Sequence, residues 1–167
     1  MSQFSLDIKS LKVGSLEADG DAAKILTSPG EIKENTVKVT QADATQTKIK
    51  AAGKSQPVIV INEDGDITVE YDIMTFDVEV MQNYMGGYLT GTAPNKIWNK
   101  PSKSPIIEKT HEIVDSQGAT WLFPRVHVSA TLVGVFSPTD VNVIRVKGTV
   151  LEPAKVGVTS VSYGNPA

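Results

Sequence analysis

Apolar and polar side chains alternate along much of this chain, as in β-strands with one buried and one solvated face. In residues 67–73 the odd positions are apolar, while Thr68, Glu70 and Asp72 are polar. A β-branched run at residues 58–61 comes before this strand, and Asp64-Gly65 lies between the two. Because Asp-Gly favours the positive φ of a tight turn, we predict a β-hairpin that joins these two strands.

Similar alternation predicts strands in the rest of the chain. The longest has Leu122, Val126 and Val128 on one parity, followed by Ala130 and Leu132. Eight or nine strands in one domain of 167 residues predict a mainly β fold, an antiparallel β-sandwich or barrel. The other candidate strands are residues 4–13, 36–41, 45–50, 106–114, 141–151 and 156–163.

One segment has helical rather than strand spacing. Phe76, Val80 and Tyr84 follow an i, i+4, i+8 pattern, and the double glycine at 86–87 is a strong helix stop. We therefore predict one short flanking α-helix over residues 76–85, with its apolar stripe packed in the core.

Two long stretches, residues 14–35 and 86–105, contain several glycines and prolines and are predicted to be loops. Compact domains rarely carry such loops unless the loops bind something or reach a neighbour. Tyr88, Ile97 and Trp98 lie in the second loop and are candidate subunit-interface residues. Trp98 could equally fold back over its own core. A C-terminal arm is expected from about residue 154.

Charge and composition narrow the function classes. Acidic side chains outnumber basic ones by six in residues 1–83, whereas basic ones outnumber acidic ones by three in residues 84–167. Copies could attract each other head to tail if the halves formed different surfaces, although loop composition alone would explain the split equally well. The sequence shows neither a signal-peptide pattern nor an apolar run long enough for a membrane helix, so we expect synthesis in a cytoplasm.

The residues that most catalytic sites need are missing or unsupported. The chain has no cysteine and two histidines, His111 and His127, both in predicted strands. They lack the ligand spacing of a zinc site, and the sequence has no Gly-x-Ser-x-Gly nucleophile elbow. We therefore interpret them as strand residues that are solvated or hydrogen-bonded and have no catalytic role. We expect no enzymatic activity, no cofactor and no metal.

Clustered carboxylates offer two further candidates. Glu63, Asp64 and Asp66 are close in sequence but lack the order of an EF-hand calcium loop, and a solvated hairpin tip explains them. Glu70 and Asp72 share one strand face, as a glycosidase acid–base pair would, but no aromatic platform for a sugar lies nearby in sequence.

Three segments follow one another in a recognisable order. The first is the strand of residues 67–73 with the helix of residues 76–85 and its double glycine. The second is the strand pair of residues 105–114 and 121–126, and the third is the closing strand of residues 141–153. This order, over residues 67–153, resembles that of phage major tail tube proteins, a family related to the tube proteins of contractile injection systems and type VI secretion.

The resemblance implies a function as well as a fold. Six copies of a tail tube protein close a ring, and rings stack into a hollow tube through which the genome passes. The implied partners are further copies of the chain, other tail proteins (tape measure, terminator and baseplate) and DNA as non-specific transiting cargo, with no membrane. The implied location is the virion tail, after assembly in the cytoplasm of the host bacterium.

A conduit for DNA should not hold phosphates, so an acidic or neutral lumen is expected. Glu70 and Asp72 are one candidate for the lumen face, and Glu108 and Glu112 are another. Two alternatives remain open. One is a tube protein of a contractile injection or type VI secretion system, and the other is a stand-alone ligand-binding β-sandwich.

Overall fold

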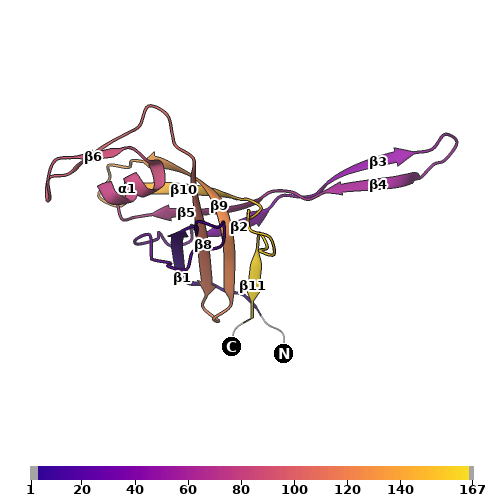
Figure 1. Ribbon diagram of the computed structural model, residues 1–167, viewed down its shortest axis with the longest axis horizontal. Helices are drawn as coiled ribbons and strands as arrows, with labels where there is room; N and C mark the ends of the chain where they lie inside the picture. The colour runs from indigo at the N-terminus through magenta and orange to yellow at the C-terminus, as the bar shows by residue number, and fades with distance from the viewer. Residues whose placement is uncertain (1–3, 166–167) are drawn as a thin grey trace.

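The computed structural model describes residues 4–165, and its body is one curved antiparallel sheet of seven strands (Figure 1). The strand order is β1-β8-β9-β10-β5-β2, and β11 pairs with the first part of β9. The predicted mainly β fold with antiparallel pairing is confirmed. The strands of the sheet are β1 (Ile8–Ser15), β2 (Lys38–Gln41), β5 (Ile67–Ile73), β8 (Ile107–Asp115), β9 (Thr120–Val133), β10 (Val143–Val150) and β11 (Ser162–Gly164).

Two small ribbons and one helix complete the described elements. β3 (Thr45–Lys50) pairs with β4 (Pro57–Glu63), and β6 (Tyr88–Thr90) pairs with β7 (Ile97–Asn99). The predicted loop at 86–105 therefore contains a ribbon, whereas residues 16–37 make only isolated bridges to β1 and β5. The C-terminal segment from residue 154, expected as an arm, folds back so that β11 lies along β9.

The core lies between β5 and β8, which face each other because the sheet curls. Val69, Tyr71 and Ile73 on one side of β5 are almost completely buried, as their alternation predicted. The Tyr71 hydroxyl oxygen reaches His111 Nε2 on β8 at a distance of 2.8 Å. The opposite side of β5 carries its polar residues, so the sheet has an inner apolar face and an outer polar face.

The buried parity of β9 changes halfway along the strand. Phe123 and Val126 are both fully buried although they are three residues apart, because the pairing with β8 shifts by one residue beside Pro124. A β-bulge accommodates proline, which has no N–H to donate to a neighbouring strand. The prediction that Leu122 shares a face with Val126 and Val128 is therefore wrong, because Leu122 lies before the bulge.

The predicted hairpin turn at Asp64-Gly65 is also wrong. β4 pairs with β3, and β5 pairs with β10 and β2, so residues 64–66 join two successive strands of one long ribbon. The reversal lies instead between β3 and β4, where Gly53 has a φ of 77°. Gly65 does not form a turn. It allows the backbone of residue 42 to come close, because a Cβ at position 65 would lie 2.1 Å from the Ala42 carbonyl oxygen.

The helix α1 (Val78–Met85) forms where helical spacing predicted it. Asp77 caps its start by accepting a hydrogen bond from the Val78 N–H, and Gly86 ends it with a φ of 75°. Met81 and Tyr84 are buried in the core, as expected. Phe76, which was also assigned to the buried stripe, lies before the helix and is exposed.

His111 is buried and uncharged in this core. Its Nδ1 lies 3.3 Å from the Lys109 carbonyl oxygen, so Nδ1 carries the proton, and Nε2 accepts the hydrogen bond from the Tyr71 hydroxyl. Burial disfavours the charged ring and lowers the pKa of His111 from 6.5 to about 4.

The fold should lose stability as the pH falls from 6.5 to about 4. In that range the unfolded chain binds a proton at His111 that the folded chain excludes, so the free energy of unfolding falls by up to about 3 kcal/mol. Urea denaturation at a series of pH values measures this slope. His111→Gln should flatten it and His127→Gln, on the outer face, should not; an unchanged slope in His111→Gln would contradict the assignment.

Candidate assembly interface

The most exposed element of the molecule is the ribbon of β3, β4 and their turn, residues 45–63, called the β3–β4 hairpin below. It projects away from the body (Figure 1), and every side chain in it except that of Pro57 is exposed. Both strands of the hairpin connect directly to strands of the main sheet, because β2 leads into β3 and β4 leads into β5. At this junction the Ala42 N–H donates to the Asp66 carbonyl oxygen at 2.9 Å.

The two faces of the β3–β4 hairpin differ in chemistry. Ile49 lies opposite Ile59, and Ile61 follows on the same side, so three isoleucines form one apolar surface, called the isoleucine face. Each of the three is about half exposed, at 45%, 51% and 48% respectively. Lys48 lies opposite Val60 on the other side. A two-stranded hairpin is marginal in water unless a surface covers it, so the isoleucine face is a candidate contact.

The predicted interface residues lie on the β6–β7 ribbon. Tyr88 and Ile97 are exposed, at 60% and 61%, on the outer side of this ribbon. Trp98 is on the inner side, where it packs against the core and its indole N–H donates to the Gly86 carbonyl oxygen at 2.8 Å. The structure thus separates the three residues, leaving two available to a neighbour and using Trp98 to attach the ribbon.

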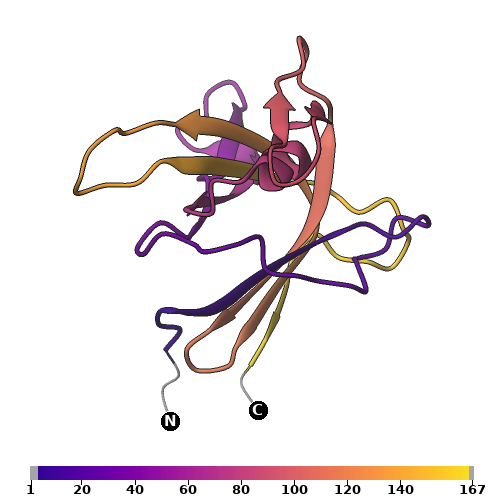
Figure 2. The same ribbon diagram turned by 90° about the vertical axis from the view of Figure 1, so that its left-hand side faces the viewer.

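A further apolar contact point lies on the loop between β9 and β10, which extends from the body as the long orange loop of Figure 2. Phe136 in this loop is 94% exposed. The alternation pattern gave no reason to single it out, because it falls between two strands. The available signal was an aromatic residue next to the turn residues Ser137 and Pro138.

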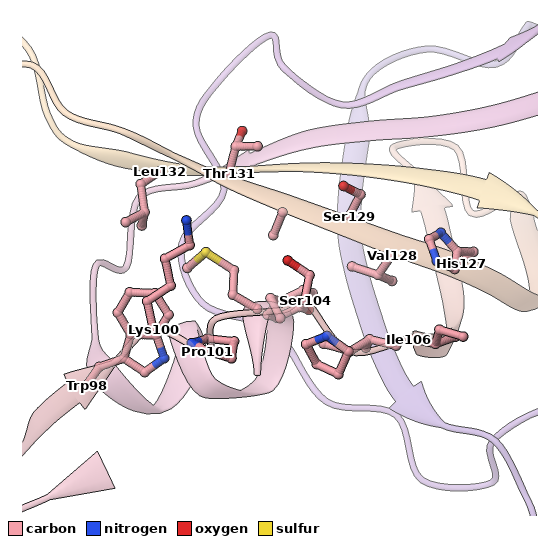
Figure 3. Close-up of a pocket in the computed structure, with 15 residues that line it drawn as sticks. Trp98, Lys100, Pro101, Ser104, Ile106, His127, Val128, Ser129, Thr131 and Leu132 are labelled. Carbon is pink, nitrogen blue, oxygen red and sulfur yellow. The ribbon is translucent and has the colours of Figure 1, made fainter. Parts of the chain in front are cut away.

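A groove of about 570 Å³ lies between β9, the end of α1 and residues 100–107 (Figure 3). Trp98, Ile106 and Leu132 give it apolar walls, and His127 and Ser129 add polar groups from β9. Its volume is within the range of small-molecule sites. His127 and Trp98 contribute the ring N–H or N groups of its lining.

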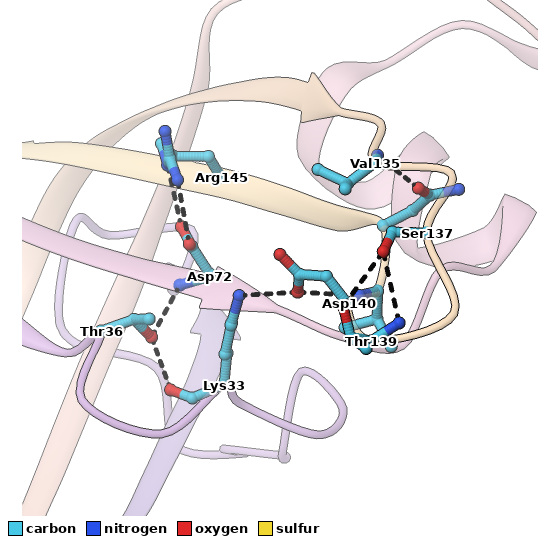
Figure 4. A network of polar contacts seen from close by, with 10 residues as sticks. Lys33, Thr36, Asp72, Val135, Ser137, Thr139, Asp140 and Arg145 are labelled. Carbon is cyan, nitrogen blue, oxygen red and sulfur yellow. Dashed lines mark hydrogen bonds and ion pairs between the residues drawn. The ribbon is translucent and has the colours of Figure 1, made fainter.

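The predicted lumen residues of β5 lie on the outer sheet face, next to cations of β10. Arg145 donates two hydrogen bonds to the Asp72 carboxylate, at 3.1 and 3.2 Å (Figure 4). Lys147 lies 4.0 Å from Glu70. The β5–β10 register places both pairs directly opposite each other. This part of the outer face therefore has mixed charge rather than a uniformly acidic surface.

Glu108 and Glu112 lie on the outer face of β8. Arg125 on β9 donates two hydrogen bonds to Glu108, both at 2.9 Å, and these bonds lower the pKa of that carboxyl group. Glu112 pairs in register with Lys12 on β1 and Leu122 on β9. The structure thus brings all four predicted lumen residues to one sheet face, and three of them, Glu70, Asp72 and Glu108, form ion pairs there.

The sequence halves do not form separate surfaces. β8, β9 and β10, from the second half of the chain, are contiguous in the sheet, and first-half strands flank them, β1 on one side and β5 with β2 on the other. Ion pairs such as Arg145–Asp72 and Lys33–Asp140 nevertheless join the two halves, so their charges of −6 and +3 are not kept on separate surfaces. A head-to-tail attraction, if present, must come from smaller charged regions.

Comparison of the chain with protein-family models and with curated proteins found no match. Among residues 4–165, no three histidine, aspartate or glutamate side chains gather into a group that could hold a metal ion. Glu63, Asp64 and Asp66, considered above for calcium, lie at the exposed junction of β4 and β5. No helix in the same described range is long and apolar enough to span a membrane.

Trypsin should cut the unassembled chain first within the β3–β4 hairpin. Lys50 and Lys54 are in or next to its exposed turn, whereas Lys109 and Arg125 lie in central strands of the sheet. Peptide mass mapping after brief digestion of dilute protein gives the order of cleavage. Early cleavage at Lys109 or Arg125, before the hairpin is cut, would show that the hairpin is not the least protected part of the fold.

Proposed function

We propose that this chain is a structural protein, not an enzyme, that assembles with copies of itself into stacked hexameric rings and forms the tube of a phage tail. The observation that carries the proposal is the isoleucine face of the β3–β4 hairpin, which residues 4–165 leave about half exposed. An apolar surface on a long two-stranded ribbon costs solubility in a monomer and contributes free energy in an assembly.

The positions of the exposed apolar surfaces support head-to-tail assembly. The β3–β4 hairpin and the β6–β7 ribbon lie at opposite ends of the longest axis of the molecule (Figure 1). Tyr88 and Ile97 are exposed at one end and the isoleucine face at the other. Contacts between two different surfaces are heterologous, and such contacts generate closed rings or open filaments.

The charge pairing on the outer sheet face supports the proposal that DNA passes along it. Its arginines and lysines could hold phosphates, but Arg125 and Arg145 are each bonded to a carboxylate. Neutralised cations release few counterions on contact with DNA and so bind it weakly. The resemblance to phage tail tube proteins implies the proposed partners, which are other copies, the tape measure, terminator and baseplate proteins, and DNA in transit, in the virion tail. A tube of a contractile injection or type VI secretion system would use the same assembly with another cargo.

A second candidate function is a stand-alone ligand-binding β-sandwich. The groove beside α1 favours it, because its volume of about 570 Å³ and its mixed lining suit a small ligand. This candidate requires a stable monomer, whereas the tube proposal requires association, so the oligomeric state separates the two.

The double substitution Ile59→Thr with Ile61→Thr should weaken assembly by about 100-fold in protein concentration. Threonine keeps the β-branch that suits a strand but removes apolar surface, at about 1.5 kcal/mol for each side chain. Sedimentation velocity over a range of concentrations measures the shift from monomer to assembly. Circular dichroism should show an unchanged β fold, because the hairpin lies outside the core.

The control on the opposite face of the same strand is Val58→Thr with Val60→Thr, which also replaces two β-branched apolar residues by threonine, although each change removes less apolar surface than Ile→Thr. It should reduce assembly much less than the isoleucine pair. Equal assembly of the wild type and the isoleucine variant would refute the proposed contact.

A further inference from the structure

The β3–β4 hairpin has opposite charges at its two ends. The chain carries four exposed carboxylates where the hairpin leaves the body, and this region is called the hairpin base: Asp43, Glu63, Asp64 and Asp66. In the outer half, three exposed lysines are called the hairpin tip: Lys48, Lys50 and Lys54. At the usual rise of about 3.3 Å per residue, the six residues of β3 separate the two regions by up to about 20 Å.

These charges have no ion-pair partner in the described part of the chain. Within residues 4–165, none of the seven side chains takes part in an ion pair, although seven such contacts occur elsewhere in that part of the chain. The strand separates the two regions along its length, so one hairpin cannot bring its own tip to its own base. Lys48 also lies on the side opposite the isoleucine face and stays accessible when that face is covered.

We propose that the hairpin tip of one copy docks on the hairpin base of the next copy. This contact rests on the proposed function, because it requires self-association, and it adds the partner surface and the register. Three lysines meeting four carboxylates give complementary charge, which fixes orientation and raises the association rate. The isoleucine face then supplies apolar burial against the neighbouring copy, while the charges select how successive copies are staggered.

Repetition is built into this contact. Each copy has one tip and one base. A row of copies therefore always ends in one unused tip and one unused base, to which another copy can bind. Such a contact continues until a ring closes or a filament grows. A nucleic acid would be a poorer partner, because its phosphates could neutralise the lysines of the tip but leave the carboxylates of the base without a partner.

Charge exchange tests the contact with two altered chains. The tip-reversed chain carries Lys48→Glu, Lys50→Glu and Lys54→Glu. Alone it should need at least about tenfold more protein to assemble at low salt, because its tip repels every available base. Mass photometry and sedimentation velocity measure the assembled fraction.

The base-reversed chain carries Asp43→Lys, Asp64→Lys and Asp66→Lys, and alone it should be equally impaired. An equimolar mixture should regain assembly, because each chain then offers the charge that the other needs. Mass spectrometry of the recovered assemblies should find both chains in about equal amounts, and the assemblies should exceed two copies.

A control chain with Lys9→Glu, Lys24→Glu and Lys103→Glu has the same net charge as the tip-reversed chain, but the changes lie at exposed sites outside the hairpin. It should assemble nearly as the wild type does. Assembly by the tip-reversed chain alone, or failure of the mixture, would overturn the tip-to-base contact and leave the proposed function standing. A wild-type chain that stays monomeric at the highest soluble concentration would overturn both.

Discussion

The structure depends on one constraint: the ribbon that carries the exposed hairpin is continuous with the centre of the sheet. β5 lies between β10 and β2, and its inner side chains are almost completely buried. The same chain direction continues back through Gly65 into β4, where no second layer covers the ribbon. Because the core fixes β5, it also fixes the direction in which the hairpin leaves the body.

This arrangement links packing to assembly. The core holds the sheet together through aliphatic contacts and one buried tyrosine–histidine hydrogen bond. The outer face is close to neutral because arginines lie opposite carboxylates on neighbouring strands. Exposed apolar residues lie on both the β3–β4 hairpin and the β6–β7 ribbon. These two elements are at opposite ends of the long axis (Figure 1), as a repeated head-to-tail contact requires.

The alternation of apolar and polar residues predicted where the strands lie better than which strands pair with each other. β5 and β10 follow their patterns because each has one buried face, and the helix follows its spacing up to Gly86. The pairing of β4 was mispredicted because Asp64-Gly65 has the composition of a turn, whereas the structure uses Gly65 for close approach. The bulge at Pro124 depends on long-range pairing with β8, which no local pattern encodes.

The candidate site was predictable only in part. The acidic residues at 63–66 and the lysines at 48–54 are visible in the sequence, but their arrangement at opposite ends of one hairpin requires the β3–β4 register. The cationic neighbours of Glu70 and Asp72 come from a strand more than 70 residues away. Charge patterns within one segment could therefore not show whether the outer face is acidic.

The central claim is that the chain assembles head to tail through the β3–β4 hairpin. Electron microscopy of the concentrated wild-type protein tests it most directly. The account predicts rings or tubes in which the hairpin of each subunit lies against its neighbour. Dispersed single subunits at the highest soluble concentration, with the hairpin still projecting into solvent, would contradict it.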